Sequence, residues 1–374
     1  AVDLNILSMH RSELLAFLMK DAKNKIAISG SHGKTTVSSM VTWILHHSNK
    51  NPTAVVGGII GKLGTNVLAG SNDIFVVEAD ESDKSLLNYK PTIALVNNID
   101  AEHLDVYKNL DEVKNTFLKF FKKLPANGSG KAILNIDDGL ASSLISSIDS
   151  PVLTYGIMDK RNPDFLGKNI KLLADASTFE VWNNSNCLGS IELNVPGVFN
   201  VTNALAAMVV SLELGVEFEA IKSAIKCFPG VGRRFEFKGT CNGANVFDDY
   251  AHHPTEILNT AIAAKNRTNG KLFIVFQPQR YSRTRDLWKE FVQVFKTIDA
   301  YKCFVLDIYS AGEKSVSGIS SKELVAAIGA NNVIYSESKE DVVQELKDEL
   351  RFSDLVITMG AGDVFKVAVD LLSS

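Results

Sequence analysis

The sequence has little of several features that would point to a particular class of protein. Its four cysteines, Cys187, Cys227, Cys241 and Cys303, stand far apart, which excludes a zinc-ligand spacing or a disulfide framework and favours a cytoplasmic location. No apolar run approaches the roughly 18 residues of a membrane span, and the first residues show no signal-peptide pattern. With 39 basic and 43 acidic residues the net charge is −4, so neither nucleic acid nor a membrane surface is an expected partner.

The composition is that of a globular protein with more than one domain. Hydrophobic residues make up 45% and charged residues 22% of 374 positions, and a chain of this length usually forms two or three domains. Short β-rich runs alternate with helical patterns, which predicts the α/β class with mainly parallel sheets. The expected strands are residues 25–29, 73–79, 91–97 and 131–135, then antiparallel edge strands within 177–195.

A turn-rich segment divides the chain. Residues 228–234 contain one proline and two glycines, and a second strand and helix series follows them, so a domain boundary is expected there. We expect a leading segment at 1–22, a central domain at 23–229 and a C-terminal domain at 230–374.

The stretch Gly30-Ser-His-Gly-Lys-Thr-Thr36 follows the first expected strand and opens a helix. It lacks the first glycine of a strict phosphate loop, because Ile28 stands at that position. Backbone N–H groups at such a junction can surround a phosphate, Lys34 can neutralise it and Thr35 can bind Mg²⁺. The alternative is a glycine turn with a solvated lysine. The residues expected at the phosphates are Gly30, Ser31, His32, Gly33, Lys34, Thr35 and Thr36.

Acidic residues follow the next expected strand. Glu78 is the first acid after the apolar run 74–77, and a carboxylate at the tip of a neighbouring strand can complete the Mg²⁺ shell. Acidic turns are also common on surfaces. The third strand leads to His103 near the same edge, although a lone histidine is more often a structural hydrogen-bonding group.

These motifs resemble those of the Mur ligases, ATP-dependent enzymes that add amino acids to the peptidoglycan precursor. Their phosphate loop is typically G-T-x-G-K-T-[ST], and here Ser31 replaces the threonine. The resemblance implies a P-loop-type, mainly parallel ATPase domain followed by a smaller Rossmann-like domain. It also implies that Thr35 and Glu78 hold one Mg²⁺ and that His103 helps to bind a second, although Glu102 replaces the usual aspartate before this histidine.

Further motifs resemble the family members that join L-alanine to UDP-N-acetylmuramate. Asp-Asp-Tyr-Ala-His-His-Pro-Thr-Glu-Ile stands unbroken at 248–257, and Phe-Gln-Pro-Gln-Arg-Tyr-Ser-Arg-Thr at 276–284 has Gln279 in place of a histidine. Gln279 is therefore given no role. In the motif at 195–203 Phe199 replaces a histidine, while Asn200 and Asn203, implied to contact adenine, are present.

The second-domain motifs can also be interpreted from their chemistry. Side chains alternate along a strand, so Asp248 and Asp249 cannot both face one site. The strand end delivers Tyr250 and His252 to the crevice where α/β sheets bind ligands, unless this loop only caps a helix.

Four arginines of this domain are candidates. Arg280 and Arg283 follow another strand end and could grip a carboxylate or phosphate, or form a solvated face. Arg233 and Arg234 lie in the expected hinge, and domain closure could bring one of them to the γ-phosphate. The sequence does not distinguish these two; we predict Arg234 as catalytic and Arg233 as a nucleotide contact.

The resemblance implies an amide-forming ligase that uses ATP and Mg²⁺ to join L-alanine to UDP-N-acetylmuramate through an acyl phosphate. The catalytic residues would be Lys34, His252, Arg234, Arg280 and Arg283. Two alternatives stay open: a recycling ligase that attaches a whole peptide, and an ATP-binding regulator without ligase activity.

The glycine-rich segment 57–66 is expected to be a flexible loop that contacts the nucleotide-sugar. Residues 1–374 contain no counterpart of the family's N-terminal UDP-binding domain, so weak affinity for the UDP-sugar is expected.

Overall fold

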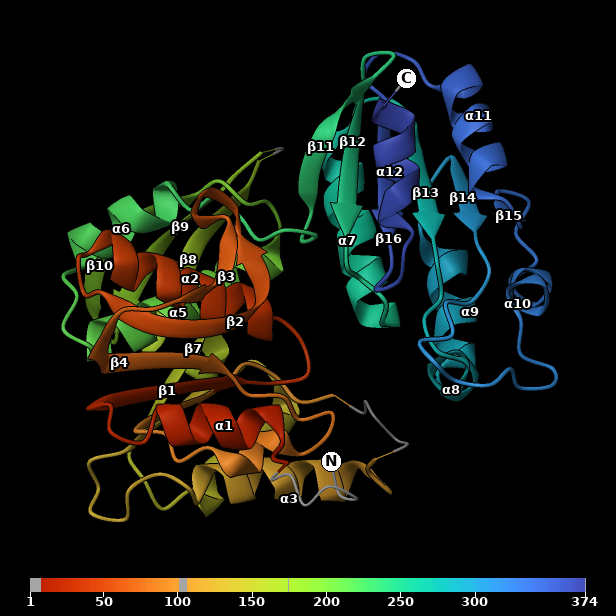
Figure 1. Ribbon diagram of the computed structural model, residues 1–374. Coiled ribbons are helices and arrows are strands. Elements are labelled where there is room, and N and C mark those ends of the chain that lie inside the picture. Colours follow the sequence, from red (N-terminus) through yellow and green to blue (C-terminus); the bar gives the residue numbers. More distant parts are fainter. Residues whose placement is uncertain (1–7, 101–105, 174, 374) are drawn as a thin grey trace. The chain divides into compact units, whose positions relative to one another are not determined.

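The computed structural model describes residues 8–100, 106–173 and 175–373, and the chain forms two compact units, each with its own sheet (Figure 1). The first unit comprises Ala1–Leu172 and Ala176–Val231, and the second comprises Leu173–Asp175 and Gly232–Ser374. Within the described ranges no helix is long and apolar enough to cross a membrane.

The first unit is built on a ten-stranded sheet of order β10-β9-β8-β7-β6-β5-β1-β4-β2-β3. The strands from β8 to β2 along this order run parallel, whereas β9 pairs antiparallel with β8 and β10, and β3 pairs antiparallel with β2. In chain order the strands are β1 (Asn24–Ser29), β2 (Pro52–Ile60), β3 (Thr65–Leu68), β4 (Ser71–Glu78), β5 (Ile93–Val96), β6 (Lys131–Asn135), β7 (Val152–Gly156), β8 (Phe165–Leu172), β9 (Ser177–Asn183) and β10 (Asn186–Leu193).

Helices cover both faces of this sheet. They are α1 (Arg11–Leu18), α2 (Lys34–His47), α3 (Leu110–Phe121), α4 (Gly139–Ser142), α5 (Val198–Glu213) and α6 (Phe218–Lys226), with 3₁₀ turns η2 (Gly61–Leu63), η3 (Ser85–Asn88), η4 (Ile145–Ser147) and η5 (Asp159–Arg161). Strand β1 shows why both faces need cover, because Ile26 and Ile28 pack into the core under α2, α5 and α6, while Ala27 packs into the core under α3. The end of β1 is thereby held rigidly between two cores.

The expected elements of the first unit are present with one correction. The strands near 25, 73, 91 and 131 and the antiparallel edge pair β9 and β10 are confirmed. The prediction of a flexible loop over 57–66 is wrong, because β2 continues to Ile60 and returns through η2 into β3. β-branched residues such as Ile59 and Ile60 sustain the strand beyond the glycines. Gly57 also lies in this strand. The position requires glycine, because a side chain there would collide with the Glu78 carboxylate.

The second unit is built on a six-stranded sheet of order β11-β12-β16-β13-β14-β15, parallel except for the edge strand β11. Its strands are β11 (Glu236–Cys241), β12 (Ala244–Asp249), β13 (Leu272–Phe276), β14 (Lys302–Val305), β15 (Val333–Tyr335) and β16 (Leu355–Met359). Its helices are α7 (Pro254–Arg267), α8 (Tyr281–Asp286), α9 (Trp288–Thr297), α10 (Ser321–Ile328), α11 (Lys339–Glu349) and α12 (Phe365–Leu372). Separate cores lie on the two faces, one under α7, α9 and α10 and the other under α11 and α12. The α/β prediction is confirmed.

Candidate active site

The turn between β1 and α2 has the backbone conformation of an anion-binding loop. Gly30 and Gly33 have φ values of 130° and 81°, a left-handed region that favours glycine. A Cβ at Gly33 would lie 2.6 Å from both the Asn203 Oδ1 and the Asn97 Nδ2 atoms, so a side chain has no room there. Gly33 is the N-cap of α2 and offers no capping side chain, which leaves the first N–H groups of the helix for a ligand.

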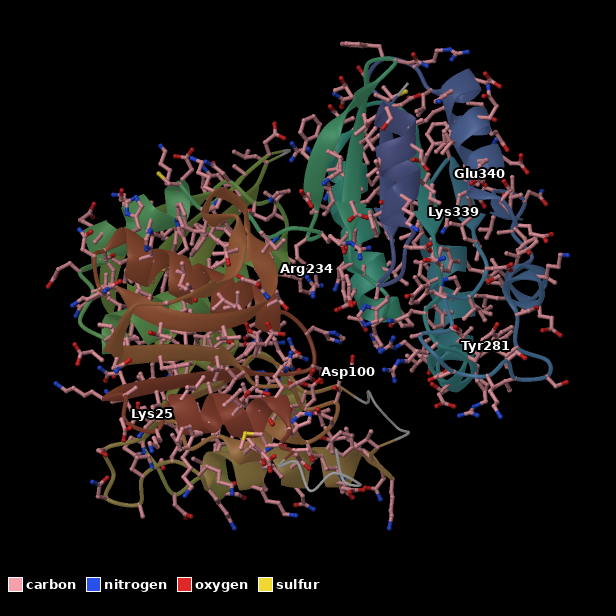
Figure 2. All side chains as sticks on the ribbon, viewed as in Figure 1. Lys25, Asp100, Arg234, Tyr281, Lys339 and Glu340 are labelled. Carbon is pink, nitrogen blue, oxygen red and sulfur yellow. The ribbon has the colours of Figure 1, made fainter. Side chains whose placement is uncertain are left out.

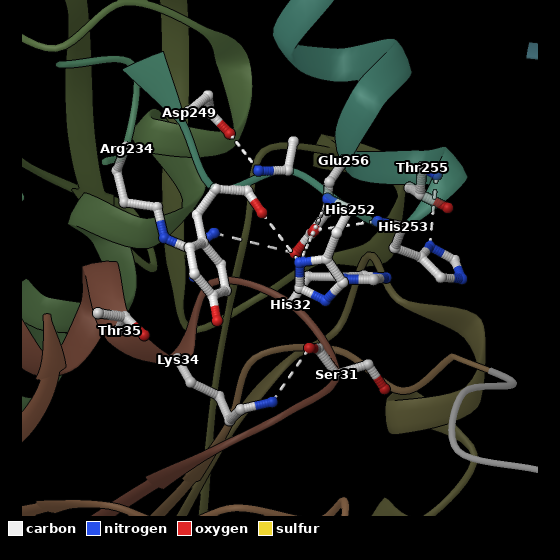
Figure 3. A network of polar contacts seen from close by, with 12 residues as sticks. Ser31, His32, Lys34, Thr35, Arg234, Asp249, His252, His253, Thr255 and Glu256 are labelled. Carbon is white, nitrogen blue, oxygen red and sulfur yellow. Dashed lines mark hydrogen bonds and ion pairs between the residues drawn. The ribbon is translucent and has the colours of Figure 1, made fainter. Parts of the chain in front are cut away.

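The side chain of Lys34 folds back onto this loop. Its Nζ donates to the carbonyl oxygens of Gly30 at 2.8 Å and Ser31 at 3.1 Å (Figure 3) and lies 2.9 Å from the Glu81 Oε1. Glu81 is 2% exposed, so a buried carboxylate compensates the ammonium. Sequence reasoning missed Glu81, although it belongs to the acidic run that begins with Glu78.

The predicted Mg²⁺ ligands of the first unit lie in contact with each other. The Thr35 hydroxyl donates to the Glu78 Oε1 at 3.1 Å, and the Gly57 N–H donates to the Glu78 Oε2 at 2.8 Å. A hydroxyl and a carboxylate are the hard oxygen ligands that Mg²⁺ prefers, so the two side chains fit such an ion. Thr36 is buried in the first turn of α2. His103 lies outside the described residues.

The other predicted nucleotide contacts of the first unit surround the loop. The His32 N–H donates to the Asn98 Oδ1 at 2.7 Å, and its Nε2 lies 3.1 Å from the Asp100 Oδ2. Asn203 in α5 accepts a bond of 3.0 Å from Asn97, and Asn200 donates to the Pro196 carbonyl at 2.7 Å. The start of α5 therefore lies beside the phosphate loop.

Arg233 is fixed by its own unit. Its backbone φ is 58°, its Nε donates to the Asp248 Oδ2 at 2.9 Å, and its Nη2 donates to the Gly360 carbonyl at 2.6 Å. Asp248 is 1% exposed and also accepts from the Thr358 hydroxyl at 2.6 Å. The guanidinium of Arg233 therefore compensates a buried carboxylate.

Arg234 has a looser environment. Its Nη1 lies 4.0 Å from the Glu256 Oε1, its guanidinium carbon is 5.3 Å from the centre of the Tyr250 ring, and its side chain is 28% exposed. A pair at 4.0 Å is weak, because its Coulomb energy is partly screened by solvent. The geometry thus distinguishes the two arginines that the sequence left equivalent.

Asp248 and Asp249 point to opposite faces of β12, as the alternation predicts. Asp249 accepts hydrogen bonds of 2.7 Å from the N–H groups of Phe235 and Ala251. Burial raises the pKa of Asp249 to about 6, although Arg234 and the two N–H donors oppose the shift. Asp249 thus supports the loop that follows, while Asp248 supports Arg233.

That loop holds His252 as a neutral imidazole. Burial lowers the pKa of His252 to about 4, against the attraction of Glu256. Its Nδ1 lies 2.9 Å from the Tyr250 carbonyl, which can only accept, so the proton resides on Nδ1 and Nε2 keeps its lone pair. His253 is different, because its Nδ1 accepts from the Thr255 N–H and caps α7, whose first residue is Pro254 (Figure 3).

The arginines after β13 differ in their partners. Arg280 has a φ of 67° and an exposed side chain, whereas the Arg283 Nη1 donates to the Gln279 Oε1 at 2.6 Å. Gln279, to which the sequence gave no role, therefore orients Arg283. Gln279 and Arg283 are four residues apart, a spacing at which side chains near a helix can meet. This spacing was the sequence signal that could have indicated the contact.

Comparison with known proteins agrees with this architecture. Residues 28–211 match the Mur ligase middle domain, and residues 233–362 match the domain described as Mur ligase, glutamate ligase domain. The chain belongs to the Mur ligase family.

Individual relatives carry the comparison further. A UDP-N-acetylmuramate–L-alanine ligase of Clostridium acetobutylicum is 44% identical over 372 residues, which are 99% of this chain and 80% of that protein. The crystal structure of a UDP-N-acetylmuramate-alanine ligase from Thermotoga maritima has a TM-score of 0.77 at 24% identity and covers 96% of this chain and 77% of its own. A MurF ligase from Thermotoga maritima, solved in complex with ADP, has a TM-score of 0.74 at 17% identity and covers 98% and 84%. The two structures show the same fold.

Proposed function

We propose that this chain joins L-alanine to the carboxylate of UDP-N-acetylmuramate with consumption of ATP, a step of peptidoglycan precursor synthesis in the cytoplasm. The observation that carries the proposal is the contact between Thr35 and Glu78 beside the Lys34 loop, in a chain 44% identical to a ligase of that name. The contact supports a phosphate and Mg²⁺ site, and the relative supports the choice of substrates.

The chemistry requires an activated carboxylate, because a free carboxylate would have to expel oxide. A carboxylate oxygen of the muramate attacks the γ-phosphorus of ATP, the bond to the β-phosphate oxygen breaks, and ADP leaves. The resulting acyl phosphate is attacked at its carbonyl carbon by the neutral amine of L-alanine. Phosphate leaves with the original carboxylate oxygen, and the amine loses its proton.

The first unit would bind the nucleotide and stabilise the transferred phosphoryl group. The loop from Gly30 to Thr36 supplies N–H donors, and Lys34 exchanges a loop carbonyl or Glu81 for phosphate oxygens. Thr35 and Glu78 would hold Mg²⁺, which neutralises phosphate charge when bound. We propose Asn200 and Asn203 as adenine contacts and His103 as a ligand of a second Mg²⁺.

The second unit would orient the reactants. Arg234 is the hinge arginine that we propose for the γ-phosphate, because Arg233 is engaged with Asp248 and two loop carbonyls. His252 is neutral well above pH 4, so it would act as a hydrogen-bond partner rather than as a cation. Together with Tyr250 it would orient the substrates, and Arg280 and Arg283 would receive a carboxylate.

The test measures phosphate release from Mg·ATP and UDP-N-acetylmuramate with either L-alanine or the cell-wall tripeptide as acceptor. Release that depends on L-alanine is expected. Dependence on the tripeptide would assign the chain to the recycling ligases, and no release from protein that binds ATP would favour a regulator. With a carboxylate labelled by ¹⁸O, the acyl phosphate predicts one labelled oxygen in the released phosphate; unlabelled phosphate would exclude that intermediate.

A further inference from the structure

A line of side-chain amides, of which Asn97 and Asn203 are buried and Asn200 is partly buried, connects the phosphate loop with the start of α5. Asn97, which follows β5, donates from its Nδ2 to the His32 carbonyl and to the Asn203 Oδ1, both at 3.0 Å. Asn203 donates to the Asn200 Oδ1 at 3.4 Å, and Asn200 donates to the Pro196 carbonyl at 2.7 Å. The line thus ends on backbone carbonyls at both sides.

These two carbonyls fix the direction of every amide between them. A carbonyl can only accept, so the His32 carbonyl requires the Asn97 NH₂ group, which in turn requires the oxygen of Asn203. At the other end, the Pro196 carbonyl requires the Asn200 NH₂ group as its donor. The Asn200 oxygen then faces Asn203 and requires the Asn203 NH₂ group. The two constraints agree, and reversal of any one amide would oppose two acceptors or two donors.

Tyr155 in β7 completes the arrangement. Its hydroxyl donates to the Asn97 Oδ1 at 2.6 Å, and its side chain is 0% exposed while Asn97 is 3% exposed. Burial raises the pKa of Tyr155 well above the usual range, so the hydroxyl keeps its proton and can donate to the Asn97 Oδ1. This hydrogen bond adds to the amide orientation that the His32 carbonyl requires.

The amides also fit the loop by shape. The position of a Cβ on Gly33 would lie 2.6 Å from the Asn97 Nδ2 and 2.6 Å from the Asn203 Oδ1. The two amides therefore close around the glycine at the N-cap of α2, and a rotation of either would change the space beneath the loop.

We propose that Asn97, oriented by Tyr155, is a positioning residue for the nucleotide, because it couples the conformation of the phosphate loop to that of Asn203. This inference depends on the proposed function, in which the loop binds phosphates and the start of α5 binds the base. Neither Asn97 nor Tyr155 needs to touch the nucleotide.

The test compares wild type, Tyr155→Phe, Asn97→Ala and the double variant. Tyr155→Phe keeps the ring and removes one hydrogen bond, so the Kd of MgADP in calorimetry and the KM of ATP should rise about three- to tenfold. The KM of L-alanine should stay within about twofold, since its proposed contacts lie in the other unit. In the Asn97→Ala background Tyr155→Phe should have no further effect on either constant, because the two residues act as one chain. Tyr89→Phe, another buried tyrosine of the first unit, is the matched control and should leave both constants unchanged.

Several outcomes would overturn the inference. Equal MgADP binding by wild type and Tyr155→Phe would remove the coupling while leaving the proposed function intact, and so would additive effects in the double variant. A lower melting temperature with unchanged nucleotide constants would show a purely structural role. If wild type bound no MgADP, both the inference and the proposed nucleotide site would fail. Tyr155→Phe alone keeps the test decisive if Asn97→Ala does not fold.

Discussion

The two units hold their candidate site residues in different ways. In the first unit the loop from Gly30 to Thr36 is fixed by glycine backbone and by side-chain amides, and the ammonium of Lys34 is bound to two loop carbonyls. In the second unit some candidate cations are held less firmly, since Arg280 is exposed and Arg234 has an ion pair at 4.0 Å and a ring contact with Tyr250. If this loop is the phosphate site, as we propose, its backbone is already in place for a polyphosphate, whereas loosely held cations can move toward a substrate. The first unit is thus organised for binding and the second for adjustment.

The largest expected effect comes from removing the cation of the organised loop. Lys34→Ala should lower kcat by about 10²- to 10³-fold, the usual result of deleting one preorganised electrostatic group. Lys25→Ala is the control, because Lys25 lies in β1, the strand before the loop, and its ammonium binds the Lys20 carbonyl at the surface (Figure 2). Near-normal turnover of Lys34→Ala in a steady-state phosphate assay would show that the loop is not the phosphate site.

A pair of variants in the second unit should separate function from stability. Arg234→Ala is expected to reduce kcat about 10²-fold through the lost charge on the phosphoryl group, with little change in the free energy of unfolding. Arg233→Ala should instead cost about 3 kcal/mol of stability, because it leaves the Asp248 carboxylate buried without its cation.

Urea unfolding and initial rates measured on both variants check this assignment. If Arg234→Ala unfolded easily and Arg233→Ala kept its stability, the roles of the two arginines would have to be exchanged.

Local pattern was enough to predict most of the elements. The run from Lys25 to Ser29 is apolar on both faces and stands before a glycine turn, so its strand and the helix after Thr35 follow from nearest-neighbour chemistry. The alternation at Asp248 and Asp249 likewise predicted opposite faces. The prediction for segment 57–66 failed because four glycines suggested a loop, while β2 continues to Ile60 and pairs there with Thr65 of β3.

What the sequence could not supply was the set of long-range partners. Glu81 lies 47 positions from Lys34, and Tyr155 lies 58 positions from Asn97, so no spacing rule connects them. The sequence also could not show which of Arg233 and Arg234 is held in place. That depends on the distant carbonyls of residues 360 and 362, which accept hydrogen bonds from Arg233. These contacts arise from the order of strands in the sheet.

The buried acid and the buried histidine of the second unit should oppose each other in their pH dependence. The folded pKa of Asp249, about 6, lies above its ordinary value of 3.8, so its contribution is fully present below pH 3.8 and is lost as the pH rises through 6. The shift corresponds to about 3 kcal/mol. The folded pKa of His252, about 4, lies below 6.5, so its contribution is lost as the pH falls from 6.5 to 4.

The contributions of Asp249 and His252 to the free energy of unfolding change with pH in opposite directions. The informative quantity is therefore the difference in this free energy between wild type and a variant that lacks one of the two groups. Asp249→Asn removes the pH dependence that comes from Asp249 and keeps the one that comes from His252. The stability of the variant relative to wild type should therefore increase by up to about 3 kcal/mol between pH 4 and pH 6.5. Unfolding in urea at several pH values measures this difference. A difference that does not change with pH would mean that Asp249 titrates normally.

The smallest effect concerns the orientation of one adjustable cation. Gln279→Ala removes the acceptor at 2.6 Å from the Arg283 Nη1, and without this hydrogen bond the guanidinium should sample more rotamers. If Arg283 receives a substrate carboxylate, kcat/KM should fall about three- to tenfold, the magnitude of one ordinary hydrogen bond. Gln279→His restores an acceptor and should recover most of the loss, whereas Gln293→Ala on α9 should change nothing. Full activity of Gln279→Ala would mean that Arg283 needs no fixed orientation, and the contrast between an organised first unit and an adjustable second one would then extend to this arginine as well.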